Sequence, residues 1–164
     1  MFYKPNEYHK DIRTINFKKL YKENAIICFD LDNTLDIPDS GNEMDLQLEK
    51  YLTNLKNLGY KIIVFSNNDE GRVKKFVNHK FEYYHTVKKP FQKNYKKILK
   101  GNKNVIFVGD KIVTDIIGGN IYGGYTILVD PISPAKKEWY TKIMVFSENI
   151  FRTITRFKKG DYFE

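Results

Sequence analysis

The sequence predicts an α/β domain in which a mostly parallel sheet lies between two layers of helices. Short apolar runs rich in β-branched and aromatic residues recur along the chain, and segments with the apolar spacing of helices separate them. The length of 164 residues and the hydrophobic content of 41% are enough for one buried core. We therefore expect a single domain over residues 1–164.

Four of the apolar runs are expected to form buried strands, because each is short and is bounded by polar or glycine-containing turns. They cover residues 25–31, 61–65, 105–108 and 125–129. Residues 83–87 show a weaker strand pattern. Residues 1–22, ahead of the first strand, are interpreted as an N-terminal extension.

The segments between these runs show helical patterns. Residues 44–58 carry leucines at helical intervals and stop at Gly59, which is typical of a helix C-terminus. Two further helices are expected over residues 69–77 and 91–99. Another should follow Thr114, kept short by a cluster of glycines. The leucines of the first segment are Leu46, Leu48, Leu52, Leu55 and Leu58.

Residues 139–159 are predicted to form a basic amphipathic helix, because apolar residues recur there at helix-like spacing with arginines and lysines between them. Such a helix more often packs on its own domain. Lying on a membrane surface is the alternative.

The formal net charge of +8 favours an anionic partner such as a phosphorylated substrate, a nucleic acid or an acidic membrane surface. A merely solvated basic surface explains the charge equally well.

The first ten residues lack the apolar region of a secretory signal, and no apolar run is long enough to span a membrane. We expect a cytoplasmic protein. Peripheral contact with the inner face of the membrane is compatible with this expectation.

Cysteine and histidine usage argues against two kinds of site. Cys28 is the only cysteine and lies within an apolar run, so we expect a buried small side chain and not a catalytic thiol. The three histidines are scattered, which gives a zinc site little support.

The motif Asp-x-Asp-x-Thr, from Asp30 to Thr34, directly follows the first predicted strand. Ligands of parallel α/β sheets bind at the carboxyl ends of the strands, so these aspartates should lie at the site. Asp30 is expected to attack phosphorus as the nucleophile. Asp32 is expected to protonate the leaving oxygen and then to accept a proton from water.

Two further motifs supply groups for an anion. Ser66 and Asn67 end the second predicted strand, where a hydroxyl and an amide can donate hydrogen bonds to phosphoryl oxygens. Lys89, next to Pro90 at the start of a predicted helix, is expected to supply a fixed positive charge. We assign this role to Lys89 and not to its neighbour Lys88.

Asp110 follows the third predicted strand and offers an oxygen ligand for a hard divalent cation. Together with the Asp30 carboxylate and the Asp32 backbone carbonyl it predicts a Mg²⁺ site. Asp115 would orient Lys89 or a metal-bound water. Each motif alone could be a turn or a helix cap, but four in this order favour an active site.

With these residues in place, the chain resembles the haloacid dehalogenase (HAD) superfamily of phosphatases, and more narrowly its subfamily III A branch of phosphatidylglycerophosphate phosphatases. The resemblance implies a Rossmann-like three-layer α/β/α sandwich. The intervals between motifs hold one helix each, which leaves no room for a cap domain. Residues that carry the resemblance are Asp30, Asp32, Thr34, Ser66, Asn67, Asn68, Lys89, Pro90, Gly109, Asp110, Thr114, Asp115, Gly118, Gly119 and Asn120.

The resemblance implies Mg²⁺-dependent hydrolysis of a phosphomonoester through an aspartyl-phosphate, with phosphatidylglycerophosphate as substrate and an anionic lipid head group as partner. Catalytic roles fall to Asp30, Asp32 and Lys89, with Asp115 in support. Substrate contacts fall to Thr34, Ser66 and Asn67, and metal contacts to Asp30, Asp32 and Asp110.

Two alternative functions stay open at this point. One is a phosphatase acting on a soluble sugar or nucleotide phosphate. The other is a ribosome- or RNA-associated binding module, which the charge permits although no RNA-binding motif is recognisable. The sequence does not predict the oligomeric state.

Overall fold

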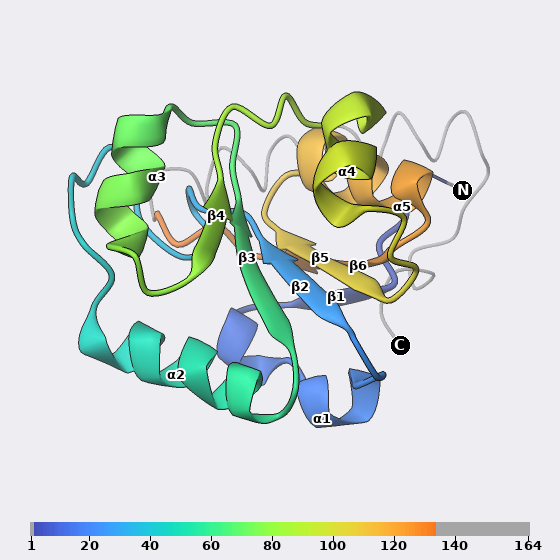
Figure 1. Ribbon diagram of the computed structural model, residues 1–164, viewed down its shortest axis with the longest axis horizontal. Helices are drawn as coiled ribbons and strands as arrows, with labels where there is room; N and C mark the ends of the chain where they lie inside the picture. Colours follow the sequence, from blue (N-terminus) through green and yellow to red (C-terminus); the bar gives the residue numbers. More distant parts are fainter. Residues whose placement is uncertain (1, 134–164) are drawn as a thin grey trace.

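The computed structural model describes residues 2–133, which form one α/β unit around a six-stranded sheet (Figure 1). All neighbouring strands of this part of the chain are parallel, in the order β1-β6-β5-β2-β3-β4. The predicted α/β fold with a parallel sheet is thereby confirmed. The strands are β1 Glu7–His9, β2 Ile26–Phe29, β3 Lys61–Phe65, β4 Glu82–Tyr84, β5 Val105–Gly109 and β6 Tyr125–Val129.

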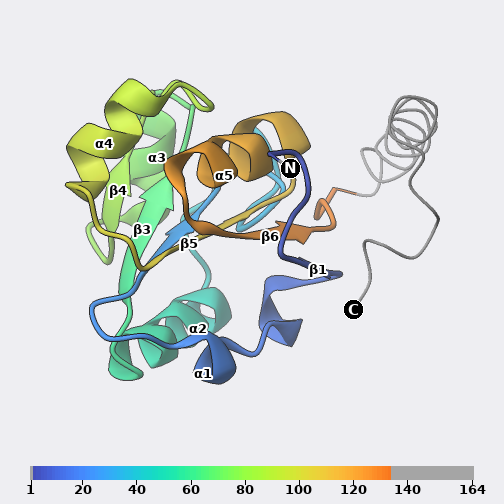
Figure 2. The ribbon, with the colours of Figure 1, turned by 90° about the vertical axis from the view of Figure 1, so that its right-hand side faces the viewer.

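Helices cover both faces of the sheet, as Figure 2 shows for α1 and α2 on one side and α4 and α5 on the other. Side chains of α3 belong to the same core cluster as those of α1 and α2. The helices are α1 Phe17–Leu20, α2 Leu46–Asn57, α3 Glu70–Val77, α4 Gln92–Leu99 and α5 Gly118–Tyr122, with a 3-10 turn η1 Ile12–Thr14 and a π-helical turn η2 Ile112–Ile117.

The apolar runs form the centre of the sheet because both of their faces are covered. Successive side chains of a strand point to opposite faces. Ile27 and Phe29 of β2 therefore join the core with Leu52 of α2, whereas Cys28 joins the core with Tyr95 of α4. The cysteine is 1% exposed, which confirms the prediction of a buried side chain.

Helix α2 is shorter than predicted at both ends. The Asp45 side chain accepts hydrogen bonds from the main-chain N–H groups of Gln47 and Leu48, which fixes the N-terminus. Leu46 in the first turn is consequently 80% exposed, and the prediction that it belongs to the apolar stripe is wrong. Leu58, just past the end, is 38% exposed and also lies outside the core.

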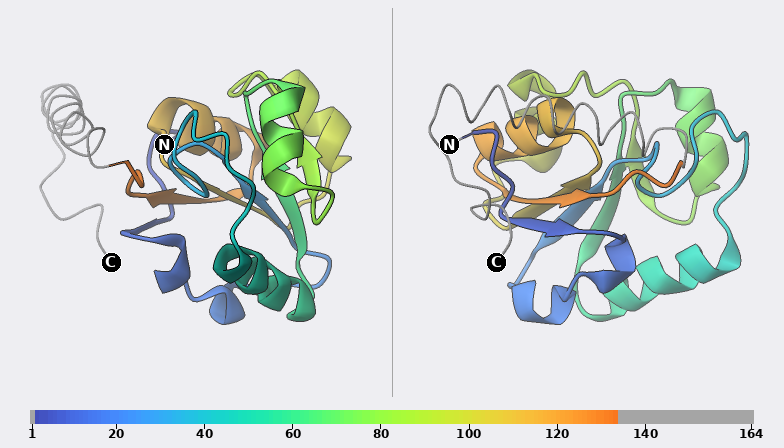
Figure 3. Two further views of the ribbon diagram at one scale, coloured as in Figure 1. Left: turned by 90° about the vertical axis from the view of Figure 1, so that its left-hand side faces the viewer. Right: turned by 180° about the vertical axis from the view of Figure 1, so that it is seen from behind.

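The N-terminal segment joins the sheet instead of lying apart from it. Strand β1 pairs with β6 at the edge of the sheet, as the rear view of Figure 3 shows. The three residues of β1 are only half-buried, and they do not form an apolar run in the sequence. Strand β4 was expected over residues 83–87 but ends at Tyr84, because Thr86 adopts a positive φ of 47°.

No separate cap interrupts the described residues, as predicted. None of the helices within residues 2–133 is long and apolar enough to cross a membrane. The amphipathic helix predicted over residues 139–159 lies outside the described part of the chain.

Candidate active site

The site lies where the order of the strands reverses. The chain passes from β2 to β3 on one side and from β5 to β6 on the other, so the loops after β2 and β5 leave in opposite directions. In parallel α/β sheets this reversal opens a crevice at the carboxyl ends of the strands. Asp30 follows β2 and Asp110 follows β5, so both aspartates lie in this crevice.

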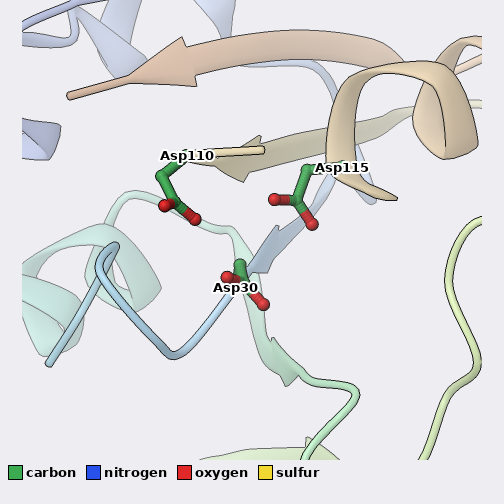
Figure 4. Close-up of side chains that lie close together, drawn as sticks. All are labelled: Asp30, Asp110 and Asp115. Carbon is green, nitrogen blue, oxygen red and sulfur yellow. The ribbon is translucent and has the colours of Figure 1, made fainter. Parts of the chain in front are cut away.

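Three carboxylates converge there, from Asp30, Asp110 and Asp115 (Figure 4). One oxygen of each lies within 4.8 Å of the others, and the three residues are between 3% and 5% exposed. Gly109 makes the approach of Asp115 possible, because a Cβ at this glycine would collide with the Asp115 carboxylate. The sequence predicted two of these carboxylates, Asp30 and Asp110, as metal ligands, and the third, Asp115, as the group that orients Lys89 or a metal-bound water.

Lys89 neutralises part of this negative charge. Its Nζ lies 2.6 Å from Asp30 Oδ1 and 2.6 Å from Asp115 Oδ1, and all three side chains are buried. Burial alone lowers the pKa of Lys89, but the charges of Asp115 and Asp30 outweigh it and the pKa is raised overall. The lysine is therefore a permanent cation. The neighbouring Lys88 is exposed and has a positive φ of 59°, so the structure places the predicted lysine, Lys89, in the site.

A divalent cation fits the oxygens that Lys89 leaves free. Asp30 Oδ2 and Asp110 Oδ1 are buried and accept no hydrogen bond from the described residues. The Lys111 ammonium lies 3.6 Å from the first oxygen and 3.4 Å from the second. Desolvation raises the pKa of Asp110 to about 7. Buried carboxylate oxygens without donors are suited to a hard cation such as Mg²⁺.

Asp32 has different surroundings from the acidic cluster. Its carboxylate is half-buried and accepts a 2.5 Å hydrogen bond from Asn68 Nδ2 on Oδ2. Arg72 Nη2 lies 3.4 Å from the other oxygen, Oδ1. The two aspartates of the motif therefore diverge, one toward Lys89 and one toward the start of α3. Arg72 cannot be recognised from the sequence, since a single arginine in a helix carries no motif.

The remaining predicted contacts lie at the same edge of the sheet. Ser66 is 1% exposed, and its Oγ accepts a hydrogen bond from the Asn68 amide. Thr34 is buried in the turn after β2, and its Oγ1 has no hydrogen-bond partner among the described residues. Both hydroxyls retain a proton to donate.

Asn67 contacts the main chain of Lys89. Its Oδ1 accepts a 2.7 Å hydrogen bond from the Lys89 amide, and its Nδ2 donates to the Lys89 carbonyl at 3.1 Å. The side chain expected to bind phosphate thus holds the main chain of the lysine. The sequence placed Asn67 in the site but could not show which group it faces.

Comparisons with known proteins agree with this geometry. The sequence model of the family described as "Mitochondrial PGP phosphatase" matches residues 2–133, a range that includes every residue of the candidate site. The probable phosphatase YqeG of Bacillus subtilis (strain 168) is 33% identical over 138 residues, which are 80% of this chain and 80% of that protein. No solved structure gives a significant match.

Proposed function

Because this chain belongs to the mitochondrial PGP phosphatase family of HAD phosphatases, we propose that it converts phosphatidylglycerophosphate to phosphatidylglycerol and inorganic phosphate, using Mg²⁺ and an aspartyl-phosphate on Asp30. The observation that carries the proposed mechanism is the buried contact of Lys89 with Asp30 and Asp115, beside the free oxygens of Asp30 and Asp110.

The proposed reaction has two steps, transfer of the phosphoryl group to Asp30 and hydrolysis of the aspartyl-phosphate. An Asp30 carboxylate oxygen forms a bond to phosphorus while the bond from phosphorus to the ester oxygen breaks, and Asp32 gives its proton to the departing alkoxide. A water molecule then attacks the same phosphorus, Asp32 takes its proton, and the bond between phosphorus and the Asp30 oxygen breaks. The products are the alcohol and inorganic phosphate, and both aspartates return to their first state.

The other residues stabilise the charge of the phosphoryl group. Mg²⁺ would be held by the Asp30 and Asp110 carboxylates and the Asp32 backbone carbonyl, and when bound it would offset the repulsion between carboxylate and phosphate. Lys89 presents a fixed positive charge, while the Ser66 and Thr34 hydroxyls supply neutral donors. Donors that are already in place cost no reorganisation when charge develops.

A lipid substrate is supported by apolar side chains around the site. Phe91 is 72% exposed and lies two residues after Lys89, whereas Val113 is 61% exposed and lies two residues before Asp115. Ile37, on the loop after β2, is 48% exposed. Exposed apolar side chains on active-site loops are suited to peripheral contact with a membrane.

Cationic side chains accompany these apolar ones. Lys88 is exposed on the same loop as Phe91, and Lys111, next to Asp110, has a side chain that is 44% exposed. An anionic lipid head group would meet positive charge on arrival. A site without a cap can accept such a head group at the membrane surface.

The test is phosphate release from phosphatidylglycerophosphate in mixed micelles and from a panel of soluble sugar and nucleotide phosphates. Wild type, Asp30→Asn and Asp32→Asn are compared with and without Mg²⁺. Turnover that needs Mg²⁺ and Asp30 and is fastest on the lipid supports the proposal. Faster turnover of a soluble ester would retain the mechanism and refute the lipid substrate.

A further inference from the structure

Arg72, in the first turns of α3, connects the acid–base aspartate to a second carboxylate. Its Nη2 lies 2.6 Å from Asp36 Oδ2, 3.2 Å from the Ile37 carbonyl oxygen and 3.4 Å from Asp32 Oδ1. The side chain is 12% exposed. One nitrogen thus contacts three acceptors of the loop that follows β2.

The position of Asp36 is fixed independently of the arginine. Its backbone amide donates a 3.1 Å hydrogen bond to the Leu31 carbonyl, and its backbone carbonyl accepts a 2.7 Å hydrogen bond from the Asn33 amide. The Ser40 hydroxyl donates to the same Oδ2 that Arg72 contacts, at 2.5 Å. Asp36 is therefore a rigid anchor for the guanidinium.

The arginine is poorly placed for a purely structural role. Its Nε and Nη1 are buried without hydrogen-bond partners among the described residues, and the Phe76 ring lies 5.7 Å from its Cζ. Buried donors without acceptors are destabilising, and buried ion pairs are weak contributors to stability. Such violations of good local structure concentrate at functional sites.

We infer that Arg72 is a positioning residue for the reaction: held by Asp36, it fixes the Asp32 carboxylate so that this group reaches the ester oxygen of the substrate. Asn68 holds Asp32 Oδ2, and Arg72 restrains Oδ1. The inference rests on the proposed function, because it assigns the acid role to Asp32.

Two substrates with different leaving groups distinguish a residue that positions the general acid from one that binds phosphate or supports the fold. An alkoxide departs only when it is protonated, whereas dinitrophenolate departs without a proton. Loss of the correct position of Asp32 should therefore impair only the first reaction. A residue that bound phosphate, or one that merely supported the fold, would affect both esters alike.

The experiment measures kcat/KM, which reports the steps up to release of the leaving group, for phosphatidylglycerophosphate in mixed micelles and for dinitrophenyl phosphate. General acids contribute about 10²- to 10⁴-fold, so Arg72→Gln should lower the value for the lipid about tenfold or more and that for the aryl ester less than about threefold. Asp36→Asn, which removes the anchor, should show the same selectivity. Arg13→Gln, in an exposed pair with Asp11, is the matched control and should change neither value.

A double-mutant cycle adds a second criterion. If Arg72 acts through Asp32, Arg72→Gln should have no effect beyond about twofold in the Asp32→Asn background. Equal losses on both esters, or additive losses in the cycle, would overturn the inference alone. Absence of Asp30-dependent turnover on both esters would overturn the proposed function and this inference with it.

Discussion

The Lys89 ammonium lies 2.6 Å from Asp115 Oδ1, and this contact joins the loop after β4 to the π-helical turn after β5. The same ammonium lies 2.6 Å from Asp30 Oδ1. A single buried cation thus sets the distance between the proposed nucleophile and the loop that carries Asp110. Stability and activity of the protein should therefore both depend on it.

Lys89→Met should destabilise the protein, because it leaves two buried carboxylates without their cation. Breaking a buried ion pair in this way costs about 3–5 kcal/mol. Chemical denaturation measures the loss. Lys61→Met is the control, since Lys61 forms an exposed pair with Glu82 at 2.7 Å and should change the free energy of unfolding by about 1 kcal/mol or less. Equal effects of the two changes would contradict the account.

Mg²⁺ affinity should increase with pH up to about pH 7. Desolvation raises the pKa of Asp110 from 3.8 to about 7, so the folded protein holds a proton there that the unfolded chain has already lost. The contribution of Asp110 to stability therefore falls as the pH rises from about 4 to about 7, and Mg²⁺ must displace the proton in that interval. Calorimetric Mg²⁺ titrations should show stronger binding at about pH 8 than at about pH 5.5, with a binding heat that depends on the buffer in acid. Equal affinities would contradict this.

Lys111→Gln should tighten Mg²⁺ binding in the absence of substrate. The Lys111 ammonium lies 3.6 Å from Asp30 Oδ2 and 3.4 Å from Asp110 Oδ1, where it repels an incoming cation. Removing one nearby like charge at a partly exposed position is expected to lower the dissociation constant by about two- to tenfold. Lys88→Gln, on an exposed lysine that forms no ion pair with Asp30 or Asp110, is the comparison. Weaker binding by the Lys111 variant would show that the ammonium is not a competitor.

The double change Phe91→Ser with Val113→Ser should impair lipid hydrolysis selectively. Both side chains are exposed and lie two residues from a site residue in the sequence, and loss of their contact with the micelle should raise the apparent KM for phosphatidylglycerophosphate about fivefold or more. Dinitrophenyl phosphate should be hydrolysed at the wild-type rate. Leu46→Ser is the control, because Leu46 is 80% exposed at the start of α2. An unchanged KM for the lipid would refute the membrane contact.

The sequence predicted the parts of the fold that are determined by burial. Strands β3 and β6 have the predicted bounds because their apolar runs are covered on both faces. Strand β1 could not be predicted, since its three half-buried residues acquire their strand structure only by pairing with β6. The exposed Leu46 shows the same limit, because a capping hydrogen bond and not apolar spacing fixes the start of α2.

The candidate site was predictable where chemistry follows a strand. Asp30 and Asp110 lie at the ends of apolar runs, and a parallel sheet brings such ends together. Arg72 and its contact with Asp36 depend on the packing of α3 against the loop after β2, over 36 residues of sequence. Spacing within a motif carries no information about such a contact, and the same holds for the hydrogen bonds between Asn67 and Lys89.

The most direct test of the mechanism is to trap the phosphoryl group. Wild type and Asp32→Asn are mixed with dinitrophenyl phosphate and Mg²⁺, quenched in acid within the first turnover, and mapped by peptide mass spectrometry. We predict a phosphoryl group on Asp30 that accumulates in Asp32→Asn, because the second step then lacks its base, and that is absent from Asp30→Asn. Phosphate release without a phosphorylated Asp30, or a phosphoryl group on another residue, would contradict the account.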